Sequence, residues 1–205
     1  MKKLPRISWR EHRRRALRRC ITIPALGLIT AALLLSLPFV IPLLGLLDLL
    51  RPTRPWARSR AVLSIAWIAS CEVVGVLAAL LLWLVYLLHR SPERFLAHNT
   101  ALQRVWTNAL FGGARRIFKM HLQVSGLAEA QHGPLLLLVR HASLVDTVLT
   151  AAVIANPARL RLRYVLKSEL LNDPCIDIVG NRLPNAFVAR SASSSKDVTS
   201  VQRLA

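Results

Sequence analysis

Residues 21–47 read ITIPALGLITAALLLSLPFVIPLLGLL, 27 residues without a single charged side chain. A second stretch, residues 61–88, has 28 residues and only one charge, that of Glu72. A helix of about 20 apolar residues crosses the hydrocarbon core of a bilayer. Both stretches exceed the roughly 7–15-residue apolar core of a cleavable signal peptide. The sequence therefore predicts two hydrophobic membrane helices within residues 21–88.

Two arrangements of these helices stay open. Each stretch is long enough for a full transmembrane span, but Pro24, Pro38 and Pro42 predict a kink in the first one. A kinked pair of helices is also compatible with a hairpin that dips into one leaflet. Glu72 lies inside the second stretch, where a carboxyl marks either a functional site or helix pairing, or is held at the interface.

The positive charge of the chain brackets these two stretches. The net charge is +18, from 28 Lys and Arg against 10 Asp and Glu, yet 54% of the residues are hydrophobic and the mean hydropathy is +0.42. Residues 1–20 carry +8, residues 51–60 carry +4 and residues 89–119 carry +5, whereas residues 120–205 carry only +3. The excess of basic residues on the flanks places residues 1–20 and the chain after residue 88 on the cytoplasmic side.

The basic N-terminus has other interpretations. Beside an apolar segment, an Arg-rich stretch is typical of contact with anionic lipid headgroups. RNA binding is disfavoured, because a soluble nucleic-acid binder is usually a polar protein. Cys20, Cys71 and Cys175 match no metal or redox spacing and give no disulfide framework.

Residues 89–114 are expected to form an amphipathic helix at the membrane interface or against the following domain. Ser91-Pro92 is a helix start, with a capping hydroxyl and proline at the first helical position. Gly112-Gly113 is expected to end this helix.

Residues 115–205 change to short apolar runs separated by turns, which predicts an α/β layer with a partly parallel sheet. We expect strands at residues 120–124, 135–139, 161–166 and 185–189. Helices are expected at residues 143–155 and 167–171, and another from residue 195 onward.

The strongest candidate for a catalytic site is His141 with Asp146, at the point where an apolar run turns into a helix. A carboxylate there could orient the imidazole, whose free nitrogen could take a proton from a hydroxyl. A structural interpretation competes with this one: Ser143 and Asp146 also have the spacing of a helix capping box. The other histidines have no such partner and are expected at surface or packing positions: His12, His89, His98, His121 and His132.

Residues 135–146 (LLLLVRHASLVD) resemble the first motif of the phospholipid/glycerol acyltransferase family, a strand followed by His-x-Ser-x-x-Asp. Residues 167–170 (KSEL) resemble a later landmark of that family. Residues 185–190 (NAFVAR) resemble its second motif, which ends in Phe-x-x-Arg, here Phe187 and Arg190. The resemblance implies an acyltransferase-type α/β domain over residues 115–205, preceded by the membrane helices.

The resemblance also implies an activity, namely O-acyl transfer from acyl-CoA or acyl carrier protein to lysophosphatidate or a related glycerol-phosphate lipid. His141 would be the general base and Asp146 would orient it. Arg190 would bind the acceptor phosphate, with Ser143 as a further substrate-binding residue. No metal, bound cofactor or nucleic acid is implied. The acceptor, the acyl chain length, the type of donor and the oligomeric state stay open.

Three features depart from the family pattern. Arg140 precedes the histidine where many members have Asn, and Pro184 and Ala189 replace the glycine and acid often found in the second motif. The family's third motif, a Pro-Glu-Gly-Thr-Arg-like loop, and its later proline motif are absent. We therefore expect a C-terminally truncated member, whose activity stays open. The alternative is a non-enzymatic membrane adaptor that binds anionic lipid through its basic N-terminus.

Overall fold

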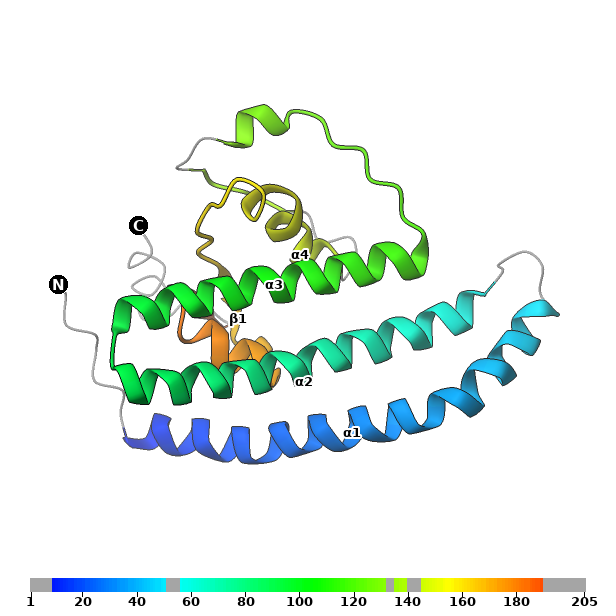
Figure 1. Cartoon of the computed structure of the whole chain (residues 1–205), viewed down its shortest axis with the longest axis horizontal. Coiled ribbons are helices and arrows are strands. Elements are labelled where there is room, and N and C mark those ends of the chain that lie inside the picture. Colours follow the sequence, from blue (N-terminus) through cyan, green and yellow to red (C-terminus); the bar gives the residue numbers. More distant parts are fainter. Residues whose placement is uncertain (1–8, 51–55, 132–134, 140–144, 190–205) are drawn as a thin grey trace.

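Three long helices lie side by side in the computed structural model, which describes residues 9–50, 56–131, 135–139 and 145–189. They are α1 (Trp9–Leu49), α2 (Ala57–His89) and α3 (Pro92–Phe118). Each runs antiparallel to the next, with α2 in the middle (Figure 1). The two expected apolar helices are confirmed as helices. Both are long and apolar enough to cross a membrane.

The first helix is longer than its apolar stretch, because it begins at Trp9 and includes the basic residues from Arg10 to Arg19. It also continues through Pro24, Pro38 and Pro42. Figure 1 shows α1 as a curved helix rather than two broken ones. Each proline removes one backbone donor and crowds the preceding turn, which bends a helix without ending it when neighbours hold it in place.

A carboxylate joins the end of α1 to the start of α2. The Asp48 side chain, near the end of α1, accepts hydrogen bonds from the Ser59 backbone N–H (3.0 Å) and hydroxyl (2.9 Å). The residue preceding α2, Trp56, provides no side-chain cap. Asp48 therefore satisfies donors in the first turn of α2 that would otherwise lack a partner.

The helix α3 starts where the sequence predicts, but it does not end where the sequence predicts. Ser91 is the N-cap and accepts from the Arg94 backbone N–H, with Pro92 at the first helical position. The predicted end at Gly112-Gly113 is wrong, because α3 continues to Phe118. A side chain at Gly113 would collide with the indole of Trp67 on α2, so this glycine permits close helix packing instead of ending the helix.

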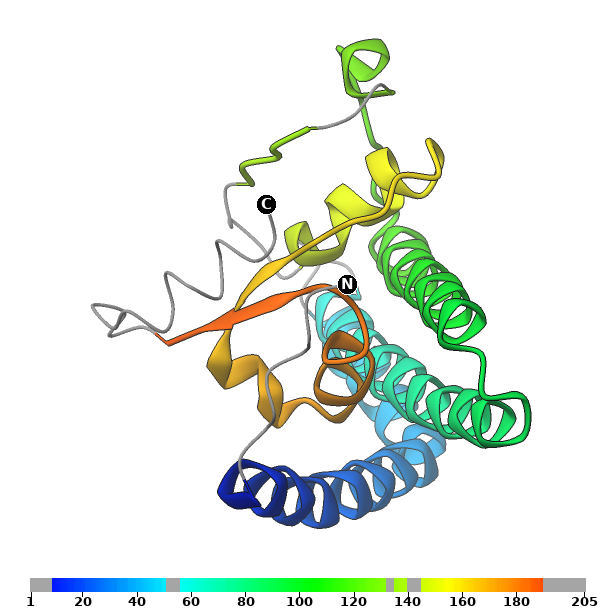
Figure 2. The ribbon, with the colours of Figure 1, turned by 90° about the vertical axis from the view of Figure 1, so that its left-hand side faces the viewer.

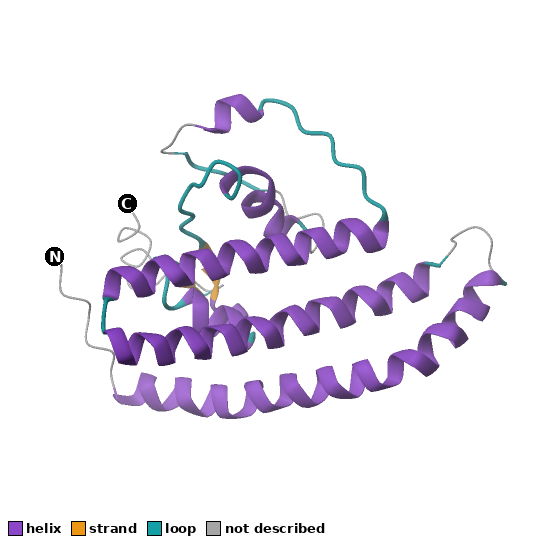
Figure 3. Ribbon diagram, in the orientation of Figure 1, coloured by secondary structure: helices purple, strands orange, loops and turns teal. Residues whose placement is uncertain are grey.

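The described part of the chain after α3 consists of short helical turns joined by loops (Figure 3). Its only sheet among the described residues has two strands, β1 (Val165–Lys167) and β2 (Ala186–Val188), paired in parallel with Leu166 opposite Phe187. The helical turns are η1 (Leu127–Gln131), α4 (Asp146–Thr150), η2 (Ala151–Ala155), η3 (Ser168–Asn172) and η4 (Ile176–Gly180). The protein is therefore mainly helical where it is described, with a small parallel α/β element.

Several predictions for this region can be compared with the structure. The helix before Asn156-Pro157 and the strand near residue 187 are confirmed, and the strand expected at residues 161–166 is shorter and lies at β1. The strands expected at residues 120–124 and 135–139 are wrong, because neither segment pairs with a strand. Leu136 and Leu138 are 87% and 89% exposed, so this apolar run is not a buried strand. A strand requires a neighbour for its backbone hydrogen bonds, and a short apolar run does not supply one.

The C-terminal segment packs on the middle of α2, on one side of the helix layer (Figure 2). Val76 and Ala79 of α2 meet Cys175, Ile178, Val179 and Leu183, and α1 and α3 contribute partly buried residues at the edges. Gly75 permits this contact, because a Cβ there would lie 2.7 Å from the Cys175 Sγ. The hydrophobic core therefore lies between α2 and η4.

A buried carboxylate joins this segment to the start of α1. Asp177, which is 1% exposed, accepts from Arg18 Nη2 (2.5 Å) and Arg19 Nε (2.6 Å). Asn181 Nδ2 also donates to Asp177, at 2.7 Å to its backbone oxygen and 3.1 Å to its carboxylate. Removal of one partner from a buried ion pair leaves the other charge without compensation.

We expect Asp177→Asn to lower the free energy of unfolding by about 3 kcal/mol, because two guanidinium groups then face a neutral amide. Thermal unfolding in a neutral detergent, followed by circular dichroism, measures the effect. The control is Glu129→Gln, which removes the same charge from an exposed position. Equal unfolding midpoints for the two variants would contradict the structural role of Asp177.

Candidate functional site

The residues of the candidate catalytic site fall into two groups. His141, Ser143 and Arg190 lie outside the described residues. Asp146 is described and is the first residue of α4. This is the first helical turn, where a carboxylate is favoured by the helix dipole. The residue before the helix is Val145, whereas the capping interpretation places the N-cap at Ser143.

The helix that begins with Asp146 is held against α3. At its end, Asn156 Nδ2 donates to Asn108 Oδ1 (2.8 Å) and to Thr107 Oγ1 (3.0 Å). Val148, Ala151 and Ala155 are buried. The helical segment 146–155 is therefore fixed by packing along its length and by side-chain hydrogen bonds at its C-terminal end.

The two later landmarks lie next to each other. Residues 167–170 begin at the last residue of β1, and residues 185–190 include β2, with Lys167 opposite Val188. Because the strands are parallel, their carboxyl ends lie at the same edge. In α/β sheets, ligands bind at the carboxyl ends of strands. The structure thus brings together two segments whose paired residues, Lys167 and Val188, are 21 positions apart in the sequence.

Asn185 fixes the position of β2. Its Oδ1 accepts from the Tyr164 backbone N–H (2.9 Å), and its Nδ2 donates to the Gly180 carbonyl (3.1 Å). The Phe187 ring packs against Gly180, where a Cβ would lie 3.0 Å from the ring. Burial raises the pKa of the neighbouring Tyr164 hydroxyl to about 12, so this phenol is neutral at physiological pH. Contacts with Tyr164 and Gly180 therefore hold residues 185–189, the described part of the second-motif segment, in place.

Arg182 connects the same region to the helices. Its Nη1 donates to the Ala79 carbonyl (2.8 Å) and to Asn99 Oδ1 (3.3 Å), and its guanidinium lies 5.1 Å from the centroid of the Phe95 ring. Burial, and secondarily the charge of Arg19, lowers the pKa of Arg182 to about 10. It remains protonated at neutral pH and contributes a positive charge beside Phe95.

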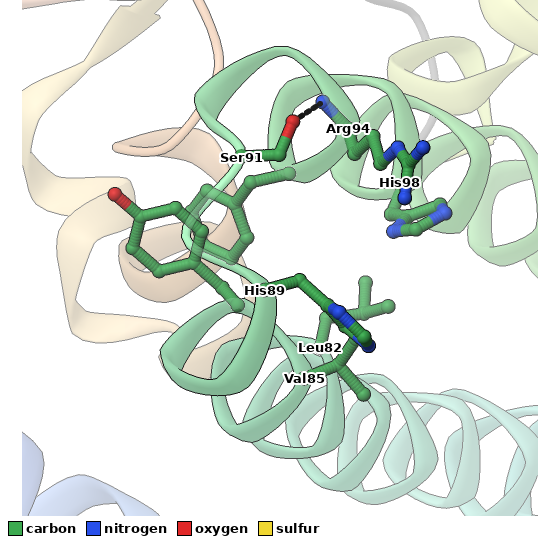
Figure 4. A pocket seen from close by; sticks show the side chains of 8 residues that line it. Leu82, Val85, His89, Ser91, Arg94 and His98 are labelled. Atoms are coloured by element: carbon green, nitrogen blue, oxygen red, sulfur yellow. Dashed lines mark hydrogen bonds between the residues drawn. The ribbon is translucent and has the colours of Figure 1, made fainter.

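A pocket of about 410 Å³ was not predicted from the sequence. It lies between the end of α2 and the start of α3 and is lined by Leu82, Val85, His89, Arg94, Phe95 and His98, among others (Figure 4). His89 and His98 were expected at surface or packing positions, and they are exposed at this pocket. The sequence feature that could have indicated this pocket is the sharp turn at Ser91-Pro92. It brings basic residues before and after it to the corner between α2 and α3.

Glu72 lies on the face of α2 that packs against the rest of the protein. It is 6% exposed, and its carboxyl contacts the side chains of Asp173 and Trp106. Its Oε2 has no hydrogen-bond partner in the described part of the chain. Of the interpretations drawn from the sequence, this position agrees with a role in packing α2 against its neighbours.

No family model, characterised protein or solved structure matches this chain. The acyltransferase resemblance of residues 135–146 and 185–190 therefore stays an interpretation of the sequence.

We expect Asn185→Ala to loosen the pairing of β1 and β2, because the Tyr164 N–H and the Gly180 carbonyl lose their partner. Loss of hydrogen bonds to buried groups costs about 1–3 kcal/mol. Hydrogen exchange measured by mass spectrometry should show faster exchange in the peptides that contain Tyr164 and Phe187. Asn172→Ala, at an exposed position, is the control and should leave that exchange unchanged. Unchanged exchange in Asn185→Ala would show that this side chain does not fix β2.

Proposed function

We propose that this chain acts as a membrane-bound O-acyltransferase, which moves a fatty acyl group from acyl-CoA or acyl carrier protein to lysophosphatidate or a related glycerol-phosphate lipid. The observation that carries the proposal is the shared edge of β1 and β2. The two segments that resemble successive family landmarks lie in adjacent parallel strands with their carboxyl ends together. The helical start at Asp146 adds support, because the first motif places its acid there.

In this proposal, the reaction is a direct transfer. His141 accepts the proton of the acceptor hydroxyl while that oxygen attacks the thioester carbonyl carbon. The new ester bond forms as the carbon–sulfur bond breaks, and the departing thiol receives the proton from the imidazolium. Asp146 orients the imidazole and stabilises its charge. Ser143 contacts substrate, and Arg190 pairs with the acceptor phosphate through its fork of donors.

An apolar surface on α1 and α2 supports membrane attachment. Large apolar side chains along both helices are exposed, including Leu28, Leu35 and Phe39 on α1 and Leu77, Leu81 and Leu88 on α2. A soluble protein rarely exposes an apolar surface of this extent. In this proposal, that surface is buried in lipid.

The packing of α3 favours a hairpin in one leaflet over two full spans. Trp67 near the start of α2 donates to the Ala109 carbonyl of α3 (2.9 Å), and Tyr86 near its end stacks on Phe95 (4.6 Å between ring centroids). The helix α3 therefore follows α2 over most of its length. It carries Arg94, Arg104, Arg115 and Arg116, each of which costs about 2.5–3.5 kcal/mol at the bilayer centre. If α2 crossed the bilayer, α3 and the domain packed on it would enter the hydrocarbon.

A hairpin that lies along the interface avoids this cost. The apolar faces of α1 and α2 enter one leaflet, and α3 with the C-terminal segment stays on the aqueous side. The basic residues before position 20 and after position 88 then lie near headgroups, and their excess places the protein on the cytoplasmic leaflet. Donor and acceptor meet at that surface.

The activity test is acyl transfer by the purified chain in phospholipid vesicles. Labelled acyl-CoA and acyl carrier protein are each supplied with lysophosphatidate, and lipid product is measured. We expect His141→Ala to reduce the rate roughly a thousandfold, because general base catalysis contributes about 10²–10⁴. His121→Ala, at an exposed position outside the motif, should retain the rate.

Two results would overturn the enzymatic proposal. One is an unchanged rate in His141→Ala, and the other is the absence of product from the unaltered chain with either donor. If the chain also bound anionic vesicles through residues 1–19 with no effect of His141→Ala or Asp146→Asn, the adaptor function would replace it.

The hairpin is tested separately by the side from which two positions react. With the three native cysteines changed to serine, single variants Arg54→Cys and Arg116→Cys are exposed to a membrane-impermeant maleimide in oriented vesicles. We expect both to react from the same side, because the loop between α1 and α2 does not cross the membrane. Reaction from opposite sides would establish full spans.

A further inference from the structure

The pocket at the corner between α2 and α3 combines basic groups with apolar walls. His89 comes from the end of α2, and Arg94 and His98 come from the first turns of α3. Figure 4 shows these three side chains around one opening, with Leu82 and Val85 beside His89. Residues 94 and 98 are one helical turn apart, so they share a face of α3.

The basic groups of this pocket are not neutralised by the protein. All three side chains are exposed, and none of them forms an ion pair or hydrogen bond with a carboxylate of the described residues. Glu93 precedes Arg94, but adjacent helical residues do not face each other. Arg182 adds a further positive charge behind the pocket wall, because its guanidinium lies over the ring of Phe95. The pocket is therefore suited to an anion.

The surroundings of the pocket favour an anion with an apolar tail. Leu82 and Val85 line it, and the adjoining outer face of α2 exposes Leu84 and Leu88, the latter by 81%. A soluble anion has no apolar part that could contact this surface. A phospholipid, in contrast, would place its phosphate at Arg94 and its acyl chains along α2. The volume of about 410 Å³ accommodates a headgroup and not a whole lipid.

We propose that this pocket binds the phosphate of an anionic phospholipid from the surrounding leaflet. Arg94 and His98 donate to the phosphate oxygens, and a guanidinium is well suited to this because its donors match two oxygens at once. His89 contacts the same headgroup from α2, and Leu82 and Val85 contact the glycerol end of the acyl chains. The site uses the membrane-facing surface proposed above but not the acyl-transfer chemistry.

Binding is tested by isothermal titration calorimetry of the whole chain in a neutral detergent. The probes are dioctanoyl phosphatidate, dioctanoyl phosphatidylcholine and inorganic phosphate. We expect saturable, Arg94-dependent binding of phosphatidate, with weaker binding of the choline lipid, whose headgroup carries no net charge. Inorganic phosphate should bind much more weakly, because it lacks the apolar part. Equal affinity for inorganic phosphate and phosphatidate would overturn the assignment to a lipid.

Variants locate the site. We expect Arg94→Gln to weaken phosphatidate binding about fivefold, and Arg94→Gln with His98→Gln to weaken it further, because charged hydrogen bonds to phosphate are lost. The matched control is Arg115→Gln, which removes the same charge from an exposed position near the other end of α3 and should have no effect. Val85→Trp fills the pocket without changing charge and should also weaken binding. Circular dichroism checks that each variant keeps its helices.

The possible outcomes decide the proposal. Equal loss in Arg94→Gln and Arg115→Gln would show attraction to overall charge and overturn it, as would unchanged binding in Val85→Trp. His141→Ala should bind phosphatidate as the unaltered chain does. If acyl transfer is absent but Arg94-dependent binding is present, the pocket stands and the enzymatic proposal falls.

Discussion

Asp177 links the first helix to the last helical turn of the described chain, because its carboxylate binds two arginines of α1. A buried carboxylate is costly to remove from water, and this one is compensated by Arg18, Arg19 and Asn181. The interaction fixes η4 over the first turns of α1, and the apolar residues of η4 and the turn after it then lie on Val76 and Ala79 of α2. The strand β2 follows directly and is held to Gly180 by Asn185. The position of the second-motif segment thus depends on a charge interaction that begins in the basic N-terminus.

The same interaction changes the interpretation of the basic N-terminal segment. The sequence alone assigns its arginines to lipid headgroups, since they precede a long apolar run. In the structure, Arg18 and Arg19 are used within the protein, with their side chains only 23% and 36% exposed. These two residues therefore contribute to the fold. In the membrane-bound protein proposed above, lipid contact is left to the basic residues before them and to those at the ends of α3.

Features with a local cause could be predicted from the sequence. The two apolar helices follow from uninterrupted apolar composition, and the start of α3 follows from Ser91-Pro92. Features that depend on distant residues could not. The run 135–139 has the composition of a buried strand but no partner strand, and Gly113 lies inside a helix because Trp67 of α2 packs there. For the candidate site, the sequence supplies His141, Ser143, Asp146 and Arg190. The structure adds the position of Asp146 as the first residue of α4 and the shared edge of β1 and β2. The pocket at His89 and Arg94 arises from the geometry of a turn, which no single motif displays.

Two side-chain interactions of this chain close loops of very different length. Asp48 reaches Ser59 over 11 residues, whereas Arg18 reaches Asp177 over 159 residues. The entropy of closing a loop grows with its length, so the short loop closes far more readily. A nascent chain emerging from a ribosome can therefore complete the α1–α2 hairpin before residue 177 has been synthesised, and in the membrane-bound protein proposed above this hairpin can enter lipid first. The long-range closure then comes last, and it docks the C-terminal segment onto a platform that already exists.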